Sequence, residues 1–187
     1  ALSLPFTGVL KPTALAACLA THKKRIGIIG TTATIKSGSY QKAILEINPD
    51  IQVFAQDCPL FVPLVENGFT SPDSDIVLSV IKHYLQPFMD ADIDTLILGC
   101  THYPLIRSTV GRIMGDQVTL VNPAYETARE LKELLQHYDI LNEEEPHLGE
   151  NKYQFYVSDG AEKFKRFANS IIKYGILSAK TIKIDEY

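Results

Sequence analysis

The chain has 187 residues, enough to bury a hydrophobic core in one large domain or two small ones. Hydrophobic residues make up 45% of it and charged residues 21%, as in ordinary globular proteins, and the net charge of -4 argues against a nucleic-acid-binding face, which should be basic. It has no apolar run long enough to span a membrane, and its first residues lack the basic start and apolar core of a signal peptide. We therefore expect neither a nucleic acid nor a membrane as a partner.

The three cysteines, Cys18, Cys58 and Cys100, are odd in number and widely spaced. This spacing favours neither a disulfide framework nor a zinc site, so we expect reduced thiols, a cytoplasmic location and no bound metal. The chain starts at Ala1 without a methionine and enters an apolar stretch almost at once, which is typical of the middle of a longer protein.

Strand and helix patterns alternate along the chain. In the first part, short apolar runs predict strands at 25–30, 51–55 and 95–99, and helical spacing predicts helices at 37–48, 73–91 and 104–114. Further along we expect strands at 118–121, 153–157 and 181–184, helices at 123–138 and 161–174, and a polar surface loop at 142–152. The alternation predicts an α/β fold with a mainly parallel sheet and helices on both faces. Ligands bind at the carboxyl ends of the strands in such sheets.

The first of these strands ends at Gly30 and runs into a hydroxyl-rich segment, Thr31-Thr-Ala-Thr34. Glycine permits a sharp turn, and the hydroxyls and free backbone N–H groups of such a loop can hold an anion. The spacing matches neither a Walker loop nor a dinucleotide-binding fingerprint. An equally good interpretation is a plain helix start that a threonine or serine caps.

The second strand is followed by an apolar loop, Cys58-Pro-Leu-Phe-Val-Pro-Leu-Val-Glu66, which two prolines stiffen. A carboxylate at the end of such a run would be partly removed from water, which would suit Glu66 to acid–base work. The alternative is an exposed glutamate at a helix start.

The third strand, Thr95–Gly99, leads directly into Cys100-Thr101-His102 and carries the sharpest signal. A cysteine between the carboxyl end of a strand and a helix N-terminus lies near the positive end of the helix dipole, which favours the thiolate as a base or nucleophile. His102 can exchange protons or orient a substrate group. The alternative is a small buried cysteine at a tight turn, the interpretation that we give to Cys18 and Cys58.

Three motifs together resemble the glutamate racemases of the aspartate/glutamate racemase family in order and spacing. They are Gly30-Thr31-x-Ala33-Thr34-Ile35, Cys58-Pro59-x-Phe61-Val62-Pro63-Leu64-Val65-Glu66 and Leu98-Gly99-Cys100-Thr101-His102-Tyr103-Pro104. The segment Gly8–Pro12 resembles the connection between the two halves of such an enzyme. The resemblance covers essentially the whole chain, and the histidine after Cys-Thr is the feature that separates glutamate racemases from their aspartate-specific relatives.

The resemblance implies a cofactor-independent racemase of two similar α/β domains. In it, two thiols on opposite faces of the substrate α-carbon interconvert L- and D-glutamate, which supplies D-glutamate for peptidoglycan. It assigns Cys100 as the acid/base of one domain, and His102 and Glu66 as its supporting acid–base groups. Glutamate would be bound by Thr101, His102, Thr31 and Thr34, with no cofactor or metal. The resemblance also leaves room for a homodimer.

The family's other catalytic cysteine, in a Cys-Asn-Thr motif, does not occur here, and the family spacing places it before Ala1. We therefore expect residues 1–117 to form the Cys100-bearing α/β domain with its linker helix. Residues 118–187 would form the C-terminal portion of the other domain. With one catalytic cysteine, the chain alone is expected to be inactive. The alternatives are a one-cysteine relative, either a decarboxylase or an aspartate-racemase-like enzyme, and an inactive fragment that acts as a binding module.

Overall fold

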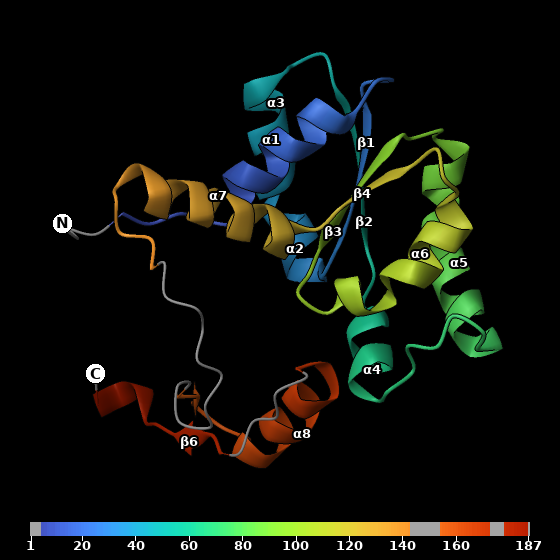
Figure 1. Ribbon diagram of the computed structural model, residues 1–187. Helices are drawn as coiled ribbons and strands as arrows, with labels where there is room; N and C mark the ends of the chain where they lie inside the picture. The colour runs from blue at the N-terminus through green and yellow to red at the C-terminus, as the bar shows by residue number, and fades with distance from the viewer. Residues whose placement is uncertain (1–4, 143–153, 173–177, 187) are drawn as a thin grey trace. The chain divides into compact units, whose positions relative to one another are not determined.

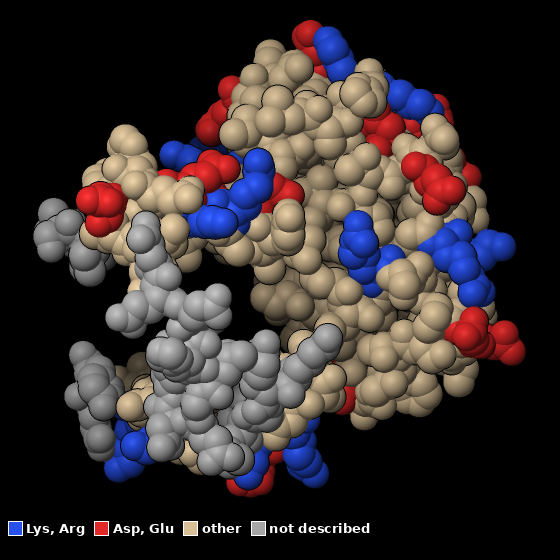
Figure 2. All heavy atoms as spheres, in the orientation of Figure 1, with Lys and Arg blue, Asp and Glu red and all other residues tan. Residues whose placement is uncertain are grey.

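The computed structural model describes residues 5–142, 154–172 and 178–186 (Figure 1). They belong to two compact units, Ala1–Leu141 and Asn142–Tyr187. No helix among the described residues is long and apolar enough to cross a membrane. Figure 2 shows one face of the molecule, on which basic and acidic side chains are interspersed.

The first unit alternates strands and helices as the sequence predicts. In chain order it contains α1 (Leu10–Ala20), β1 (Arg25–Gly30), α2 (Thr32–Ser37), α3 (Ser39–Ile47), β2 (Gln52–Asp57), α4 (Phe61–Glu66), α5 (Asp75–Asp90), β3 (Thr95–Gly99), the 3-10 helix η1 (Tyr103–Ile106), α6 (Arg107–Met114), β4 (Thr119–Val121) and α7 (Pro123–His137).

The strands of this unit form one parallel sheet in the order β2-β1-β3-β4. The central strands β1 and β3 are buried almost throughout, because helices cover both of their faces. Gly30 at the end of β1 is level with Asp57 on one side and with Gly99 on the other, so three strands end in one row. The expected α/β fold with a parallel sheet and helices on both faces is confirmed.

Helices α1, α3 and α7 lie on one side of the sheet and α5 and α6 on the other, while α4 lies beyond the carboxyl ends of the strands, next to η1 (Figure 1). On the first side, α1 and α3 bury small and branched side chains such as Ala17 and Ile44 against Ile28 of β1. On the second side, α5 buries a stripe at helical spacing, Val77, Ile81, Leu85 and Phe88.

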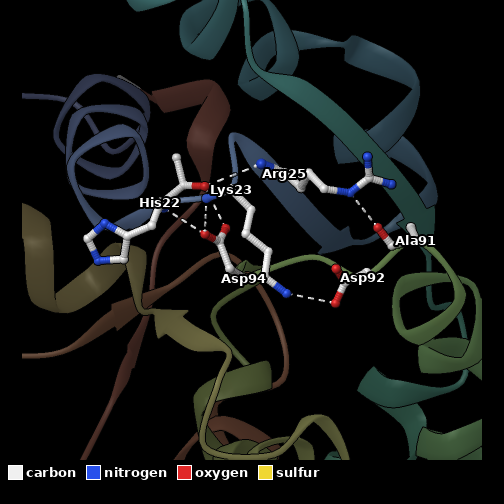
Figure 3. A network of polar contacts seen from close by, with 7 residues as sticks. His22, Lys23, Arg25, Ala91, Asp92 and Asp94 are labelled. Carbon is white, nitrogen blue, oxygen red and sulfur yellow. Dashed lines mark hydrogen bonds and ion pairs between the residues drawn. The ribbon is translucent and has the colours of Figure 1, made fainter.

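A buried carboxylate ties the start of β1 to the start of β3, at the edge of the sheet opposite to the row of strand ends (Figure 3). Asp94, which is only 7% exposed, accepts hydrogen bonds from the Thr21 hydroxyl (2.5 Å) and from the backbone N–H groups of His22 (2.6 Å) and Lys23 (2.5 Å). The Thr21 oxygen in turn accepts a bond from the Arg25 N–H at 3.3 Å. The turn between α1 and β1 is therefore held by one negative charge.

The second unit pairs two short parallel strands, β5 (Tyr156–Val157) and β6 (Lys180–Thr181), around α8 (Ala161–Ile171), and it ends in the 3-10 helix η2 (Ile184–Glu186). The rings of Phe155 and Phe164 lie 6.1 Å apart and join the strand segment to the helix. Both strands are shorter than expected, and α8 stops at Ile171. The expected loop at 142–152, apart from Asn142, the start of the predicted strand at 153 and the predicted helix end at 173–174 lie outside the described residues.

Two segments that we expected to be loops contain short helices. The hydroxyl-rich segment after Gly30 is α2, which Thr31 caps: the Thr31 hydroxyl oxygen accepts a hydrogen bond from the Thr34 N–H at 3.3 Å. The apolar segment after Cys58 becomes helical at Phe61 and forms α4. Each helix has only six residues, too few to show a helical period in the sequence.

The expected domain boundary after residue 117 falls inside the first unit. Strand β4 pairs with β3, with Thr119 level with Thr95 and Val121 level with Ile97, and α7 packs against α1. The compact unit ends only at Leu141. The physical reason is that β4 extends the sheet beside β3 and buries Val121 in the core shared by α1 and α3.

Candidate active site

The site is built at the row where β1, β2 and β3 end. The chain adds β2 on one side of β1 and then crosses to add β3 on the other side, so the strand order reverses at β1. Ligands of open α/β sheets bind at the carboxyl ends of the strands at such a reversal. The residues that directly follow the three strands are Thr31, Cys58 and Cys100.

Cys100 follows β3 in a tight turn, and the preceding residue, Gly99, lies so close to β1 that a side chain there would force its neighbours to shift. A Cβ on Gly99 would lie 2.8 Å from the Ile29 carbonyl oxygen and 3.3 Å from the ring of Tyr40. The Cys100 N–H donates to the Leu98 carbonyl at 2.8 Å, and the side chain is half-buried. The thiol is therefore held at a defined place while it stays accessible.

His102 lies between the thiol and a carboxylate. Its Nδ1 is 3.8 Å from the Cys100 Sγ, and its Nε2 is 3.4 Å from Oε1 of Glu66, which ends α4. The His102 and Glu66 side chains are 22% and 31% exposed, so the pair is partly shielded from water. A carboxylate on one ring nitrogen orients the imidazole, while the other nitrogen can exchange a proton with the thiol.

Three threonines lie near Cys100, His102 and Glu66 or at the neighbouring strand end. The Thr101 hydroxyl lies 3.4 Å from Nδ1 of His102 and is exposed. Thr31 and Thr34 form a separate pair after β1, with their hydroxyl oxygens 3.0 Å apart. The structure thus links Cys100, Thr101, His102 and Glu66 in one series of contacts, whereas Thr31 and Thr34 contact each other at the neighbouring strand end.

A buried aromatic layer lies under the site. The Tyr103 hydroxyl donates to the Cys58 carbonyl at 3.1 Å, and the Phe61 ring packs edge-on against Tyr103 at 5.1 Å and against Tyr84 at 5.3 Å. Burial, and then the charge of Cys58, raise the pKa of Tyr103, so its hydroxyl stays a donor. The sequence pattern did not single out these rings.

Cys58 and Cys18 have the surroundings of structural cysteines. Cys58 is fully buried, and burial followed by the charge of Asp57 raises the pKa of its thiol far above the ordinary range. Cys18 is half-buried with its Sγ 3.9 Å from the Ile44 carbonyl oxygen, and burial raises its pKa too. A high pKa disfavours the reactive thiolate. Over the residues that the structure describes, no group of three or more His, Cys, Asp or Glu side chains could hold a metal ion.

Comparisons with known proteins identify the family. The family model "Asp/Glu/Hydantoin racemase" matches residues 1–131. The glutamate racemase of Geobacter metallireducens is 41% identical over 171 residues, which cover 91% of this chain and 62% of that protein. The glutamate racemase of Corynebacterium kroppenstedtii is 43% identical over 143 residues, which cover 76% of this chain and 49% of that protein.

Solved structures give the same result. Glutamate racemase isoform RacE1 of Bacillus anthracis matches with a TM-score of 0.87 and 39% identity, over 98% of this chain and 66% of that one. Glutamate racemase of Francisella tularensis in complex with D-glutamate matches with a TM-score of 0.84 and 33% identity, over 99% of this chain and 66% of that one. The chain belongs to the aspartate/glutamate/hydantoin racemase family, and it spans about three fifths of the length of the Geobacter relative.

Proposed function

We propose that this chain is part of a glutamate racemase that interconverts L- and D-glutamate by proton transfer alone, without a cofactor. The observation that carries the proposal is the series of contacts from the Cys100 thiol through His102 to Glu66 at the end of β3. Support comes from the relatives named glutamate racemase and from the similar structure solved with D-glutamate. D-glutamate made in this way would serve peptidoglycan synthesis in the cytoplasm.

In the proposed mechanism, Cys100 acts as the acid/base on one face of the substrate. Its thiolate takes the α-proton, which leaves a planar carbanion and a neutral thiol, or in the reverse direction the thiol gives a proton to that carbanion. His102 takes up or returns the thiol proton through Nδ1, and Glu66 orients the ring from the other nitrogen. The hydroxyls of Thr101, Thr31 and Thr34 would bind the polar ends of glutamate.

Inversion needs a second proton donor on the opposite face, because one thiol returns a proton only to the side from which it removed one. Cys18 and Cys58 do not fit this role, since burial raises the pKa of both thiols. By the resemblance to glutamate racemases, the second donor would be a cysteine of a Cys-Asn-Thr motif, which does not occur in the 187 residues. The chain by itself should therefore not racemise glutamate.

The test follows the α-carbon of L- and D-glutamate in D2O, by circular dichroism for inversion and by proton NMR for loss of the α-proton. A polypeptide that joins this chain to the Cys-Asn-Thr segment should invert glutamate without an added cofactor. Cys100→Ser should abolish inversion, because a hydroxyl is close in size to a thiol but a far weaker acid. Cys18→Ser is the matched control and should remain active. Full activity of Cys100→Ser would show that the base is wrongly assigned, and exchange without inversion in the joined polypeptide would favour a one-thiol relative.

A further inference from the structure

Tyr103 joins the two pieces of backbone that carry His102 and Glu66. We propose that Tyr103 is a positioning residue: its hydroxyl bond to the Cys58 carbonyl holds α4, and Glu66 with it, in register with His102. Tyr103 is fully buried, so it does not reach the substrate and acts through the residues on either side of it. This role rests on the proposed function, because it concerns the acid–base partners of Cys100.

The backbone of Tyr103 closes the turn on which His102 lies. Its N–H donates to the Cys100 carbonyl at 3.2 Å, so Thr101 and His102 form the middle of a four-residue turn. The Leu105 N–H then donates to the His102 carbonyl at 3.0 Å, where η1 continues the chain. A movement of Tyr103 therefore changes where the imidazole lies.

The hydroxyl of Tyr103 reaches the peptide group that precedes α4. The Cys58 carbonyl accepts two hydrogen bonds, from the Tyr103 hydroxyl at 3.1 Å and from the Phe61 N–H at 3.1 Å. The N–H of Cys58 donates to the Gly30 carbonyl at the end of β1, at 2.9 Å. The Tyr103 ring also packs edge-on against the Phe61 ring at 5.1 Å. Cys58 thus joins the end of β1, the start of α4 and the turn after Cys100.

Helix α4 depends on its first residues for its direction. It has six residues, too few for a helix that is stable by itself, and only Phe61 and Val65 among them are buried. Glu66 lies at the far end of the helix from Phe61, about 7.5 Å along the axis. A tilt of about 10° at Phe61 would move Glu66 by about 1 Å. The 3.4 Å contact between its carboxylate and the imidazole would then be lost.

Nitrogen NMR of the imidazole tests the positioning role directly. The 187-residue chain is isotopically labelled at the histidine ring nitrogens, and the His102 signals are identified by their absence in His102→Gln. Tyr103→Phe keeps the ring and removes the hydroxyl, while the Cys58 carbonyl keeps its bond from the Phe61 N–H. We expect Tyr103→Phe to shift the Nε2 signal in the same direction as Glu66→Gln does, by a smaller amount.

A double-mutant cycle separates an effect through Glu66 from a general loss of packing. In a Glu66→Gln background, Tyr103→Phe should shift the Nε2 signal no further, because the carboxylate that it aligns is already absent. Ile44→Val trims a buried residue on α3 and should lower stability in urea unfolding without shifting the signal. A wild-type signal for Tyr103→Phe, an equal shift in both backgrounds, or the same shift in Ile44→Val would overturn the proposal.

Glutamate turnover by the joined polypeptide gives a separate readout. Tyr103→Phe should lower kcat about 3–10-fold and change KM by less than about twofold, because the carboxylate is misplaced while the binding threonines keep their positions. Turnover by the wild type, with a wild-type kcat and Nε2 signal for Tyr103→Phe, would refute the positioning role alone. No turnover by the wild type would refute the racemase function, whereas a shifted Nε2 signal would still support the hold of Tyr103 on α4.

Discussion

Replacement of Asp94 by asparagine should destabilise the first unit by an amount that depends on pH. The carboxylate is 7% exposed and accepts three hydrogen bonds, from the Thr21 hydroxyl and from the N–H groups of His22 and Lys23 (Figure 3). Asparagine has the same shape. Its oxygen can face the two N–H groups while its NH2 donates to the Thr21 oxygen, so the substitution removes the charge and keeps the geometry.

The size of the loss follows from the number of bonds. A hydrogen bond to a charged group contributes about 1.5–3 kcal/mol and a neutral one about 0.5–1.5 kcal/mol. With three bonds to one carboxylate, Asp94→Asn should lower the free energy of unfolding by about 2–4 kcal/mol at neutral pH. For a unit of this size, that corresponds to a fall in Tm of about 5–15 °C.

The pH dependence has a defined sign. Burial alone would raise the pKa of Asp94, but the hydrogen bonds from Thr21, Lys23 and His22 outweigh it and lower the pKa below its ordinary value. The unfolded chain, with an Asp pKa of about 3.9, then binds more protons than the folded one. The stabilisation is therefore fully present above about pH 4 and is lost as the pH falls through the folded-state pKa.

Urea unfolding followed by circular dichroism between pH 7 and pH 3 is the assay. The gap between wild type and Asp94→Asn should be widest near neutral pH and should shrink in acid. Asp92→Asn is the control, because Asp92 is exposed and pairs with the Lys23 Nζ at 2.8 Å; it should change stability by less than about 1 kcal/mol. A gap that is constant with pH, or no larger than that of Asp92→Asn, would refute the reasoning.

Two further predictions concern the site. Gly99→Ala should cost about 1–3 kcal/mol in urea unfolding, because its Cβ would lie 2.8 Å from the Ile29 carbonyl oxygen. Gly8→Ala, where an added Cβ meets nothing within 4 Å, is its control, and equal losses would contradict the crowding argument. Glu66→Gln should lower kcat of the joined polypeptide about 10–100-fold, because the imidazole loses the carboxylate that orients it. Glu46→Gln, an exposed change, should leave kcat unchanged; a wild-type kcat for Glu66→Gln would exclude its role.

The central strands were predictable from the sequence because they are buried on both faces. Continuous apolar runs predicted strands at Arg25–Gly30 and Thr95–Gly99, and β1 and β3 have these same bounds. Such runs carry their signal locally and do not depend on the register of neighbouring strands. Cys100 and His102 follow β3 so closely that their proximity was also predictable.

Other features depended on contacts that the sequence does not display. A three-residue strand such as β4 gives no sign of the sheet that it joins, so its pairing with β3 could not be predicted. The sequence is equally compatible with Thr31 as an anion-binding residue and as a helix cap. The structure shows that Thr31 caps α2. A role of Thr31 in binding glutamate stays a prediction. In the sequence, Tyr40 stands out only as one of the residues at helical spacing. Its approach to Gly99 depends on how α3 packs on the sheet, which the sequence does not display.

The reach of Glu66 to His102 is a consequence of packing and not of spacing along the chain. Glu66 ends α4, and α4 is placed by Phe61, whose ring lies 5.1 Å from that of Tyr103, the residue after His102. Tyr103 in turn donates to the Cys58 carbonyl just before α4 begins, so the start of α4 and the turn after Cys100 are fastened to each other. The 3.4 Å separation of carboxylate and imidazole is therefore set by buried groups beneath the site, and the polar pair needs little binding energy of its own to stay aligned.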